Sequence, residues 1–304
     1  MQLLKNVTLS KTNILFIINP ISGGRDKTNI PGLIDQHLDK GRFNANFRFT
    51  EYAGHASELA AEAGQKNFDV IVAVGGDGTI NEVGTEVLKQ DKILGILPFG
   101  SGNGLSRYLQ IPMDTVKAIK VINGLRTMRI DTATFNGRPF FNMSGMGFDA
   151  HISDLFASDK KRGLSGYVKT GLKELLNYKP ELYQIEVDGK SISRAAFVVS
   201  IANSSQYGNN TYISPEASVT DGLLDVCVIK SFPLLRLPKL AIQMLRGKTH
   251  HSKMVEIIRG RQIRILRDKA AAIHIDGEPY QMGKEIEIAV VPLSLNIITP
   301  AYEA

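Results

Sequence analysis

The chain has 304 residues, of which 43% are hydrophobic, with one cysteine, Cys227, and a net charge of +6. This length predicts two packed domains, and a single cysteine excludes a disulfide framework or a thiolate metal cluster within one chain. No apolar run approaches a membrane span, and the stretch from Met1 to Asn13 is too polar for a signal peptide, so we expect a cytoplasmic protein that meets membranes only from their surface.

The first 130 or so residues alternate β-branched runs with amphipathic stretches, a pattern typical of βαβ units on a parallel sheet with flanking helices. Strands are expected at Ile14 to Asn19, Arg42 to Thr50, Val70 to Val74 and Ile93 to Leu97. Helices are expected near Asn29 to Leu38, Ala56 to Lys66, Ile80 to Lys89 and Asp114 to Asn123. Ligands on such sheets bind beyond the carboxyl ends of the strands, so the loops after the first, third and fourth strands are the candidate site loops.

The loop after the third strand carries the strongest chemical signal, Gly75-Gly76-Asp77-Gly78-Thr79-Ile80-Asn81. Glycines let backbone N–H groups approach a polyphosphate, and the following helix directs its positive N-terminus to the same place. A carboxylate beside phosphates is repulsive unless a metal ion intervenes, so Asp77 indicates magnesium. The alternative is a tight turn with Thr79 as the N-cap of the helix.

Two further loops at the same sheet edge agree with a phosphate site. The first strand is followed by Asn19-Pro20-Ile21-Ser22-Gly23-Gly24-Arg25, and the fourth by Gly100-Ser101-Gly102-Asn103-Gly104. Arg25 is a candidate phosphate ligand, with a solvent-exposed cation as the alternative. Either loop alone would indicate a plain turn, but together they predict that residues 1–130 form an α/β nucleotide-binding domain. The Walker pattern is absent, which excludes a P-loop enzyme.

Residues 131–304 are predicted to form a second, mostly β, sandwich-like domain. The pairs Asn136-Gly137 and Asp188-Gly189 each lie between strand-like runs and indicate hairpin turns. Helical insertions are expected at Ser165 to Tyr178 and at Leu234 to Arg246, and the last strand is a candidate to return to the first domain. No long linker separates the domains, so we expect them to face each other across a cleft with a nucleotide on one side and an acceptor on the other.

A basic stretch lies in the second half of the chain. From Lys230 to Lys269 eleven Lys and Arg residues stand against Glu256 and Asp268, which predicts a basic face for anionic membrane lipids. A solvated face is the alternative. Aromatic residues do not interleave the cations from Lys239 on, so no nucleic acid partner is expected. The segment from Phe232 to Leu240 combines apolar and basic residues and is a hypothetical membrane-contact element, with a core helix as the alternative.

The chain resembles the diacylglycerol kinase catalytic-domain family, which includes bacterial lipid kinases together with sphingosine and ceramide kinases. The resemblance spans nearly the whole chain. It rests on the three loops above and on Gly54-His55-Ala56, Asn81-Glu82-Val83, Asp221-Gly222-Leu223-Leu224-Asp225-Val226 and Asp276-Gly277-Glu278.

The resemblance implies an ATP-dependent kinase that phosphorylates a hydroxyl group of a membrane lipid. ATP would be held by Asn19, Pro20, Ile21, Ser22, Gly23, Thr50, Gly75, Gly76, Asp77, Gly78, Thr79, Ile80, Asn81 and Ser101. A structural magnesium site would match Ser218, Asp221 and Leu223, the first and last through backbone carbonyl oxygens; a plain turn is the alternative for Asp221-Gly222.

The resemblance also implies a proton acceptor in Asp276-Gly277-Glu278, with Glu278 as the first choice and Asp276 as the reserve; a hairpin turn is the alternative. Some branches assign base character to the acid that matches Asp77. Many bacterial diacylglycerol kinases carry an acid where this chain has Gly104, which leaves a sphingoid base or another lipid alcohol open as the acceptor. NAD kinase and a non-catalytic nucleotide or lipid sensor are further alternatives, and a homodimer is a candidate oligomeric state.

Overall fold

Segments rich in β-branched or other aliphatic residues form three strands of the sheet of the first half, and Phe43–Phe49, in which apolar and polar residues alternate, forms another. The computed structural model describes residues 11–24, 27–158, 174 and 177–301. Four strands pair in parallel in the order β4, β3, β1, β2. They are β1 (Thr12–Ile18), β2 (Phe43–Phe49), β3 (Val70–Gly75) and β4 (Ile93–Pro98). These bounds confirm the four predicted strands to within two residues.

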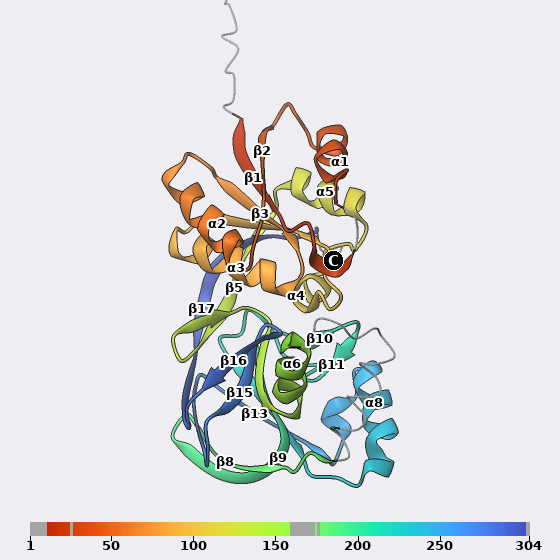
Figure 1. Cartoon of the computed structure of the whole chain (residues 1–304), viewed down its shortest axis with the longest axis vertical. Coiled ribbons are helices and arrows are strands. Elements are labelled where there is room, and N and C mark those ends of the chain that lie inside the picture. Colours follow the sequence, from red (N-terminus) through yellow and green to blue (C-terminus); the bar gives the residue numbers. More distant parts are fainter. Residues whose placement is uncertain (1–10, 25–26, 159–173, 175–176, 302–304) are drawn as a thin grey trace, which may run out of the picture.

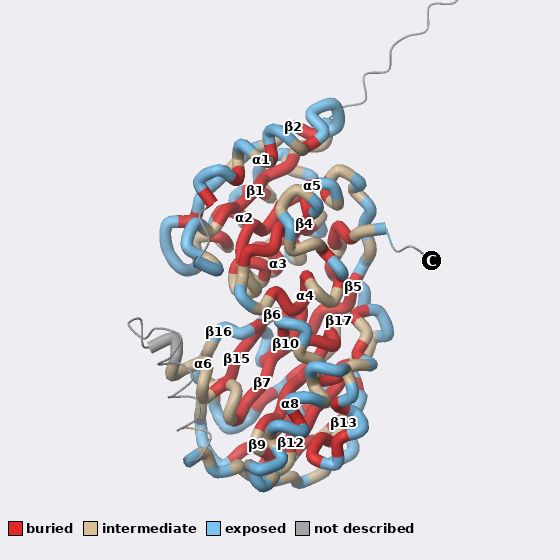
Figure 2. The backbone as a smooth tube through the Cα atoms, turned by 90° about the vertical axis from the view of Figure 1, so that its right-hand side faces the viewer, coloured by how far each residue is buried: buried red, intermediate tan, exposed pale blue. Residues whose placement is uncertain are grey.

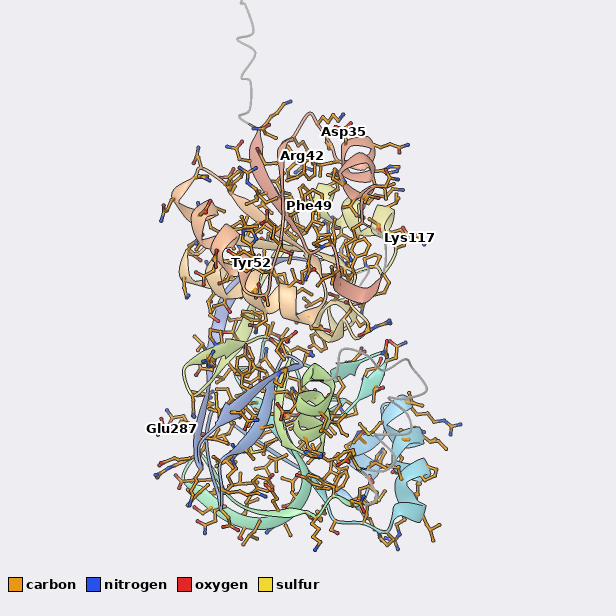
Figure 3. All side chains as sticks on the ribbon, viewed as in Figure 1. Asp35, Arg42, Phe49, Tyr52, Lys117 and Glu287 are labelled. Carbon is orange, nitrogen blue, oxygen red and sulfur yellow. The ribbon has the colours of Figure 1, made fainter. Side chains whose placement is uncertain are left out.

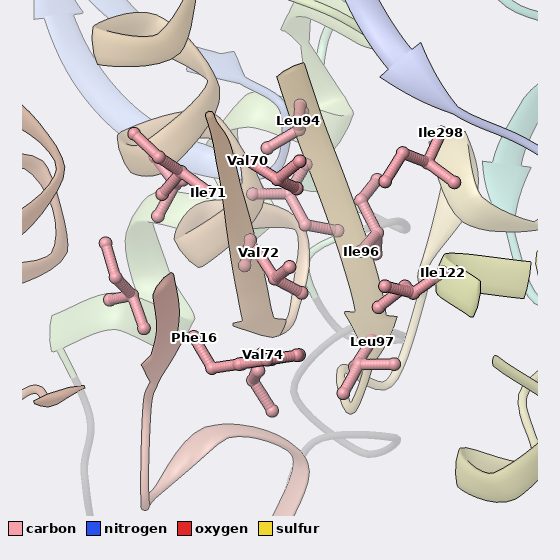
Figure 4. Packing of buried hydrophobic residues seen from close by; sticks show 14 of the residues in the cluster. Phe16, Val70, Ile71, Val72, Val74, Leu94, Ile96, Leu97, Ile122 and Ile298 are labelled. Carbon is pink, nitrogen blue, oxygen red and sulfur yellow. The ribbon is translucent and has the colours of Figure 1, made fainter. Parts of the chain in front are cut away.

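Helices cover both faces of this sheet, with α2 against α3 and α1 against α5 (Figure 1). They are α1 (Ile30–His37), α2 (His55–Gln65), α3 (Asp77–Lys89), α4 (Gly104–Tyr108) and α5 (Thr115–Gly124), with the short 3-10 helix η1 at Ser22–Gly24. Strand β3 is buried at every position because helices lie on both of its sides. Figure 4 shows the core that results, in which Phe16, Val72 and Leu97 lie within one cluster of apolar side chains.

The second half is a curved, mainly antiparallel β structure around its own apolar core, which confirms the predicted fold class. Its strands are β5 (Thr127–Phe135), β6 (Arg138–Phe140), β7 (Met143–Gly147), β8 (Glu181–Val187), β9 (Lys190–Ala202), β10 (Gln206–Gly208), β11 (Thr211–Tyr212), β12 (Leu224–Lys230), β13 (Val255–Gly260), β14 (Gln262–Arg267), β15 (Ala271–Ile275), β16 (Glu278–Met282) and β17 (Glu285–Ile298). The hairpin turns predicted at Asn136-Gly137 and Asp188-Gly189 are confirmed, and all four residues have positive φ.

Helical segments interrupt these strands. They are α6 (Phe148–Ser158), α8 (Leu237–Leu245) and the 3-10 helices η2 (Leu234–Arg236) and η3 (Thr249–His251). The insertion predicted at Leu234 to Arg246 is confirmed by η2 and α8. The helix predicted over Ser165 to Tyr178 lies, apart from residues 174, 177 and 178, outside the described residues. Within the described part of the chain, no helix has the length and apolar character needed to cross a membrane.

Strand β17 joins the two halves. It pairs antiparallel with β14 and β5, and near its end it pairs in parallel with β4, where Asn296 is opposite Ile93. The buried strands therefore run from one half into the other (Figure 2). Leu295, Ile297 and Ile298 belong to the apolar core of the α/β half.

Candidate active site

A cavity of about 920 Å³ lies at the carboxyl ends of β1, β3 and β4, where the α/β half meets the turn between β15 and β16. It brings together most of the predicted site. The predicted residues that line it are Asn19, Pro20, Ile21, Ser22, Gly23, Thr50, Gly76, Asp77, Gly78, Thr79, Asn81, Ser101, Asp276 and Glu278. Gly75 and Ile80 are not among its lining residues, and Arg25 lies outside the described residues.

The loop between β3 and α3 presents backbone N–H groups to this cavity. Helix α3 begins at Asp77, and its N-cap is Gly76, which has no side chain to accept a hydrogen bond from the first turn. The alternative in which Thr79 is the N-cap is wrong, because Thr79 lies within the first turn and its Oγ1 accepts a hydrogen bond from Asn19 Nδ2 at 3.1 Å. The first turn of α3 therefore keeps donors for an anion.

The three glycine loops fit against each other at distances that leave no room for a side chain. A Cβ atom on Gly23, whose φ is +64°, would overlap the carbonyl oxygen of Phe99. A Cβ atom on Gly100 would lie 2.6 Å from the Cα atom of Gly76. The loops after β1 and β3 thus both approach the loop after β4, which explains why each is rich in glycine.

A buried lysine holds the loop after β1 in place. Lys27 is 2% exposed, its Nζ atom donates to the carbonyl oxygens of Pro20 (3.4 Å) and Ser22, and it lies 5.3 Å from the ring centroid of Phe99. The sequence alone does not indicate this role, because a lysine in a loop is ordinarily an exposed cation.

Asp77 joins the loop after β3 to the loop after β4. Its Oδ2 accepts from the backbone N–H of Asn103 at 2.8 Å, and its Oδ1 accepts from that of Gly104 at 2.9 Å. Burial, and next the charge of Asp276, raise the pKa of Asp77 to about 6, although these hydrogen bonds oppose the rise. A Cβ atom on Gly104 would overlap Asn142 Nδ2, so the structure has no space for an acid at position 104 without moving Asn142.

Asp276 is buried, and both oxygens of its carboxylate accept hydrogen bonds. Its carboxylate accepts from the backbone N–H groups of Phe141, Asn142 and Met143 at 2.9–3.0 Å, and from Asn81 Nδ2 at 2.8 Å. Burial nevertheless raises its pKa above the ordinary aspartate value. Because Asn81 is on α3, this carboxylate connects the two halves of the molecule beside the cavity.

Glu278 has a different environment from Asp276. The residues Asp276 and Gly277, both with positive φ, form a hairpin turn in which Ile275 is opposite Glu278. The segment Asp276-Gly277-Glu278 therefore does form a hairpin turn, as the alternative interpretation expected. The turn places the Glu278 carboxylate directly over Gly78, where it would overlap a Cβ atom. Glu278 is exposed to the cavity, and no hydrogen bond connects its side chain to the described residues. Desolvation, followed by the charge of Glu82, raises its pKa.

The described lining of the cavity is strongly acidic. It includes five carboxylates and contains no lysine, arginine or histidine. The five are Glu51, Asp77, Glu82, Asp276 and Glu278. Such a lining repels a bare polyphosphate, so the donor set fits divalent cations bound together with the nucleotide. The described residues include no cluster of three or more His, Cys, Asp or Glu side chains that could hold a metal ion without the nucleotide.

The cavity also has an aromatic edge, which no motif of the sequence indicates. Tyr52, which is 55% exposed, stacks on His55 with ring centroids 4.5 Å apart and an interplanar angle of 3°. Figure 3 shows Tyr52 beside α2 and α3. Glu82, which belongs to the motif Asn81-Glu82-Val83 but was not predicted as a site residue, accepts from the backbone N–H groups of Gly54 and Ala56 and so caps the start of α2 beside the cavity. No motif of the sequence separates this role from that of an ordinary helix-surface acid.

The predicted structural magnesium residues lie together in the loop before β12, away from the cavity. Asp221 Oδ1 accepts from the backbone N–H of Leu223 at 3.0 Å, and Ser218 Oγ lies 3.2 Å from Thr220 Oγ1. One carboxylate and two backbone carbonyl groups in one loop are oxygen donors of the kind that a hard cation takes. The loop is held by the buried Asp131, whose Oδ2 accepts from the backbone N–H of Gly222 at 2.7 Å.

Comparison with known proteins finds relatives for both halves of the chain. Residues 13–135 match the family described as "Diacylglycerol kinase catalytic domain", and residues 143–299 match the "YegS C-terminal NAD kinase beta sandwich-like domain". The "Diacylglycerol kinase" of Bacillus subtilis is 29% identical over 268 residues, which are 86% of this chain and 88% of that protein. The "Probable lipid kinase YegS-like" of Klebsiella pneumoniae is 29% identical over 291 residues, which are 94% and 95% of the two chains. The crystal structure of a diacylglycerol kinase from Bacillus anthracis strain Sterne superposes with a TM-score of 0.72 at 20% identity, covering 96% of this chain and 98% of that one.

Proposed function

The chain belongs to the diacylglycerol kinase catalytic domain family, in which it is similar to lipid kinases, and on that premise we propose that it transfers the γ-phosphate of ATP to a hydroxyl group of a membrane lipid. The observation that carries the proposal is the position of Glu278. This carboxylate lies against Gly78 in the glycine-rich loop between β3 and α3, which we call the phosphate-type loop. A candidate base and a candidate phosphate site therefore lie in one cavity.

Magnesium fits the acidic lining of the cavity. When bound with ATP it would neutralise charge on the phosphates that the glycine loops hold. Asp77 is the residue expected to face that cation, through water or directly, while its hydrogen bonds to Asn103 and Gly104 keep the neighbouring loop in place. The loop of Ser218, Asp221 and Leu223 is the proposed second, structural site.

Glu278 is the proposed general base. As the lipid hydroxyl oxygen attacks the γ-phosphorus, its proton passes to the Glu278 carboxylate, the new O–P bond forms, and the bond to the β-phosphate oxygen breaks to release ADP. The raised pKa of Glu278 makes it a stronger base than an ordinary glutamate. Asp276, with four donors around it, acts as a positioning residue for the turn that carries Glu278. Asp77 remains the alternative base.

Diacylglycerol is the first acceptor to test, because relatives of this chain carry that name. Sphingoid bases and other lipid alcohols are alternative acceptors, because this chain has Gly104 where many diacylglycerol kinases carry an acid. The C-terminal half matches a domain described as NAD kinase-like, so NAD is the soluble alternative acceptor to test. A sensor without catalysis is the remaining alternative, and a homodimer stays a prediction.

The experiment is transfer of labelled γ-phosphate from ATP with magnesium to diacylglycerol, monoacylglycerol, sphingoid bases and ceramide in mixed micelles, and to NAD in solution. We expect one lipid class to be labelled and Glu278→Gln to lower kcat by roughly a hundredfold to ten-thousandfold, the usual contribution of a general base. Glu287→Gln is the matched control, because Glu287 is exposed on β17 away from the cavity (Figure 3). Labelling of NAD alone, or full activity in Glu278→Gln, would contradict the proposal.

A further inference from the structure

An apolar and basic surface runs along η2 and α8. Its residues follow each other at spacings of three or four, so they share one face of a continuous helical path. We call this face the α8 surface; it consists of Leu235, Pro238, Lys239, Ile242, Leu245 and Arg246. Leu235 is 95% exposed, Ile242 49% and Leu245 58%, and Figure 2 shows most of α8 in the exposed colour.

The opposite face of α8 already supplies the contacts that hold the helix on the β half. Leu240 is 3% exposed and belongs to a core cluster with Ile213 and Met254, and Met244 packs against the same cluster. The side chains of the α8 surface are not in that cluster. The apolar area that they leave exposed is not buried by the fold, and large exposed side chains grouped on one face indicate a partner.

The charge around the α8 surface has one sign. Residues 231–255 contain five Lys and Arg residues and no Asp or Glu. Farther along the predicted basic stretch several cations have acidic partners: Arg259 is paired with Asp225, Arg264 with Glu285 and Lys269 with Glu181. Within the described residues, the two cations of the α8 surface, Lys239 and Arg246, make no ion pair. Two cations that have no acidic partner in the described part of the chain therefore lie beside the exposed apolar side chains.

We infer that the α8 surface docks this protein on a bilayer that contains anionic lipids. The apolar side chains enter the region between headgroups and acyl chains, and the flanking cations meet the headgroups. The inference rests on the proposed function, since a kinase with a lipid acceptor must reach a bilayer, but it names a surface that the cavity does not include. An exposed helix face that carries both apolar and basic side chains matches a bilayer with anionic lipids, because such a bilayer offers an apolar interior beneath negatively charged headgroups.

A series of contacts connects α8 to the candidate site through the β10–β11 hairpin. Thr249, in η3 just after α8, donates from Oγ1 to the carbonyl oxygen of Tyr212 in β11. The turn between β10 and β11 reaches the loop after β4, where the backbone N–H of Asn209 donates to the carbonyl oxygen of Gly102 at 3.2 Å. In Figure 1 this hairpin lies between α8 and α4. Docking at α8 would therefore hold the cavity at a fixed position relative to the membrane.

The test measures sedimentation of the full chain with vesicles of phosphatidylcholine mixed with phosphatidylglycerol, and with vesicles of phosphatidylcholine alone. We expect Leu235→Ser/Ile242→Ser to weaken binding to the mixed vesicles by about tenfold or more. Lys239→Ser/Arg246→Ser should weaken it by about tenfold at low salt and little at high salt, because salt screens the headgroup charge. Circular dichroism and thermal unfolding check that each variant is folded.

Matched controls come from exposed residues elsewhere on the chain. Leu182→Ser/Leu266→Ser removes two apolar side chains that are 49% and 42% exposed on β8 and β14, and Lys40→Ser/Lys66→Ser removes two exposed cations of the α/β half. Both control variants should bind mixed vesicles as the unmodified chain does.

A second readout separates this inference from the proposed function. Phosphate transfer to a short-chain, dissolved form of the lipid acceptor needs no bilayer, so the α8 variants should keep it. If the unmodified chain phosphorylates no lipid, the proposed function fails, while vesicle binding still decides the docking. The docking inference is overturned if the α8 variants bind mixed vesicles as tightly as the controls. It is equally overturned if light scattering shows a dimer that Leu235→Ser/Ile242→Ser dissociates without change in vesicle binding.

Discussion

At the scale of single residues, the three carboxylates with proposed roles in catalysis or metal binding are held in three different ways. Asp276 accepts four hydrogen bonds and is buried, Asp77 accepts two from the backbone of a neighbouring loop, and Glu278 accepts none from the described residues. A proton acceptor needs a free lone pair within reach of its donor. Of these three, Glu278 alone combines that freedom with exposure to the cavity, which supports the proposal that it is the base and that the other two serve in positioning and in metal binding.

The raised pKa of Asp77 predicts an acid limit to activity. Below about pH 6 this carboxyl becomes protonated and loses its attraction for a cation, so kcat/KM should fall about tenfold per pH unit there. Cation binding competes with protonation, so raising the magnesium concentration should move the fall to lower pH. The measurement is kcat/KM between pH 5 and 8 at several magnesium concentrations.

Glu278 has a raised pKa as well, so the two carboxyls must be told apart. The residual activity of Glu278→Gln serves this purpose. A fall near pH 6 that persists in this variant belongs to Asp77, whereas one that disappears belongs to Glu278. A flat profile between pH 5 and 8 at low magnesium would show that neither carboxyl titrates as the structure indicates.

Single residues also show where sequence reasoning about the site reached its limit. The glycine loops, Asp77 and Glu278 were predicted because they form recognisable motifs, and the structure brings them to one cavity. Lys27 lies in no recognised motif, and Glu82 lies in one but was given no role, because the importance of both residues comes from carbonyl and N–H groups that only the folded chain places beside them. The roles assigned to the predicted residues stay predictions until activity is measured.

At the scale of elements, the glycine loops depend on the absence of side chains, but for different reasons. The position of a Cβ atom on Gly78 is taken by the end of the Glu278 side chain, which can move. The position on Gly23 is taken by the backbone of Phe99, which cannot move without displacing the loop after β4. Gly78 is therefore required for the geometry of the site, and Gly23 is required for the fold.

Two substitutions should separate these requirements. Gly78→Ala should leave thermal unfolding nearly unchanged but lower kcat on the order of a hundredfold, because it displaces Glu278 by about 1 Å or more. Gly23→Ala should lower the free energy of unfolding by about 2 kcal/mol or more, because it adds a backbone clash to a φ of +64°.

The matched control is Gly124→Ala at the end of α5, where nothing lies within 4 Å of the added carbon. It should change neither stability nor activity appreciably. Full activity of Gly78→Ala would mean that Glu278 is not held against the phosphate-type loop. Unchanged stability of Gly23→Ala would mean that the loops after β1 and β4 do not interlock.

Most elements could be predicted from the sequence, and those that could not have an identifiable reason. The parallel strands carry strong local signals, which are aliphatic runs in β1, β3 and β4 and apolar–polar alternation in β2, and the hairpin turns carry Asn-Gly or Asp-Gly pairs. Helix α4 begins with Gly104 in a glycine- and serine-rich segment that predicts a loop. Helix α6 begins with apolar residues at Phe148, Ala150 and Ile152, an alternation that favours a strand. Tertiary packing against β7 and β15 decides in favour of the helix.

At the scale of the whole molecule, the two halves share strand β17. Its end supplies Leu295, Ile297 and Ile298 to the core of the α/β half, and Asn81 and Asp276 add a hydrogen bond between the halves beside the cavity. Burying three such aliphatic side chains contributes roughly 5–9 kcal/mol, which is comparable to the whole stability of a typical domain. The α/β half therefore depends on residues that come last in the chain.

A fragment of residues 1–130 tests this dependence. We expect it to lack cooperative unfolding and to show little hydrogen-exchange protection at β4, whose pairing with β17 at Ile93 and Leu94 would be lost. The full chain should unfold in one transition. Protection of β4 in the fragment equal to that in the full chain would show that the first half is independent of β17.

The shared strand also bears on how the chain is made. A ribosome completes the four strands of the α/β sheet early, but β4 has no neighbour on its outer side until residues 296 and 297 have been synthesised. During the whole of that interval the nascent protein exposes an unpaired, apolar strand edge, which is a template for pairing with other chains. Cellular chaperones that cover such edges are thus expected to matter more for the yield of this protein than for that of kinases whose nucleotide domain closes before the rest is translated.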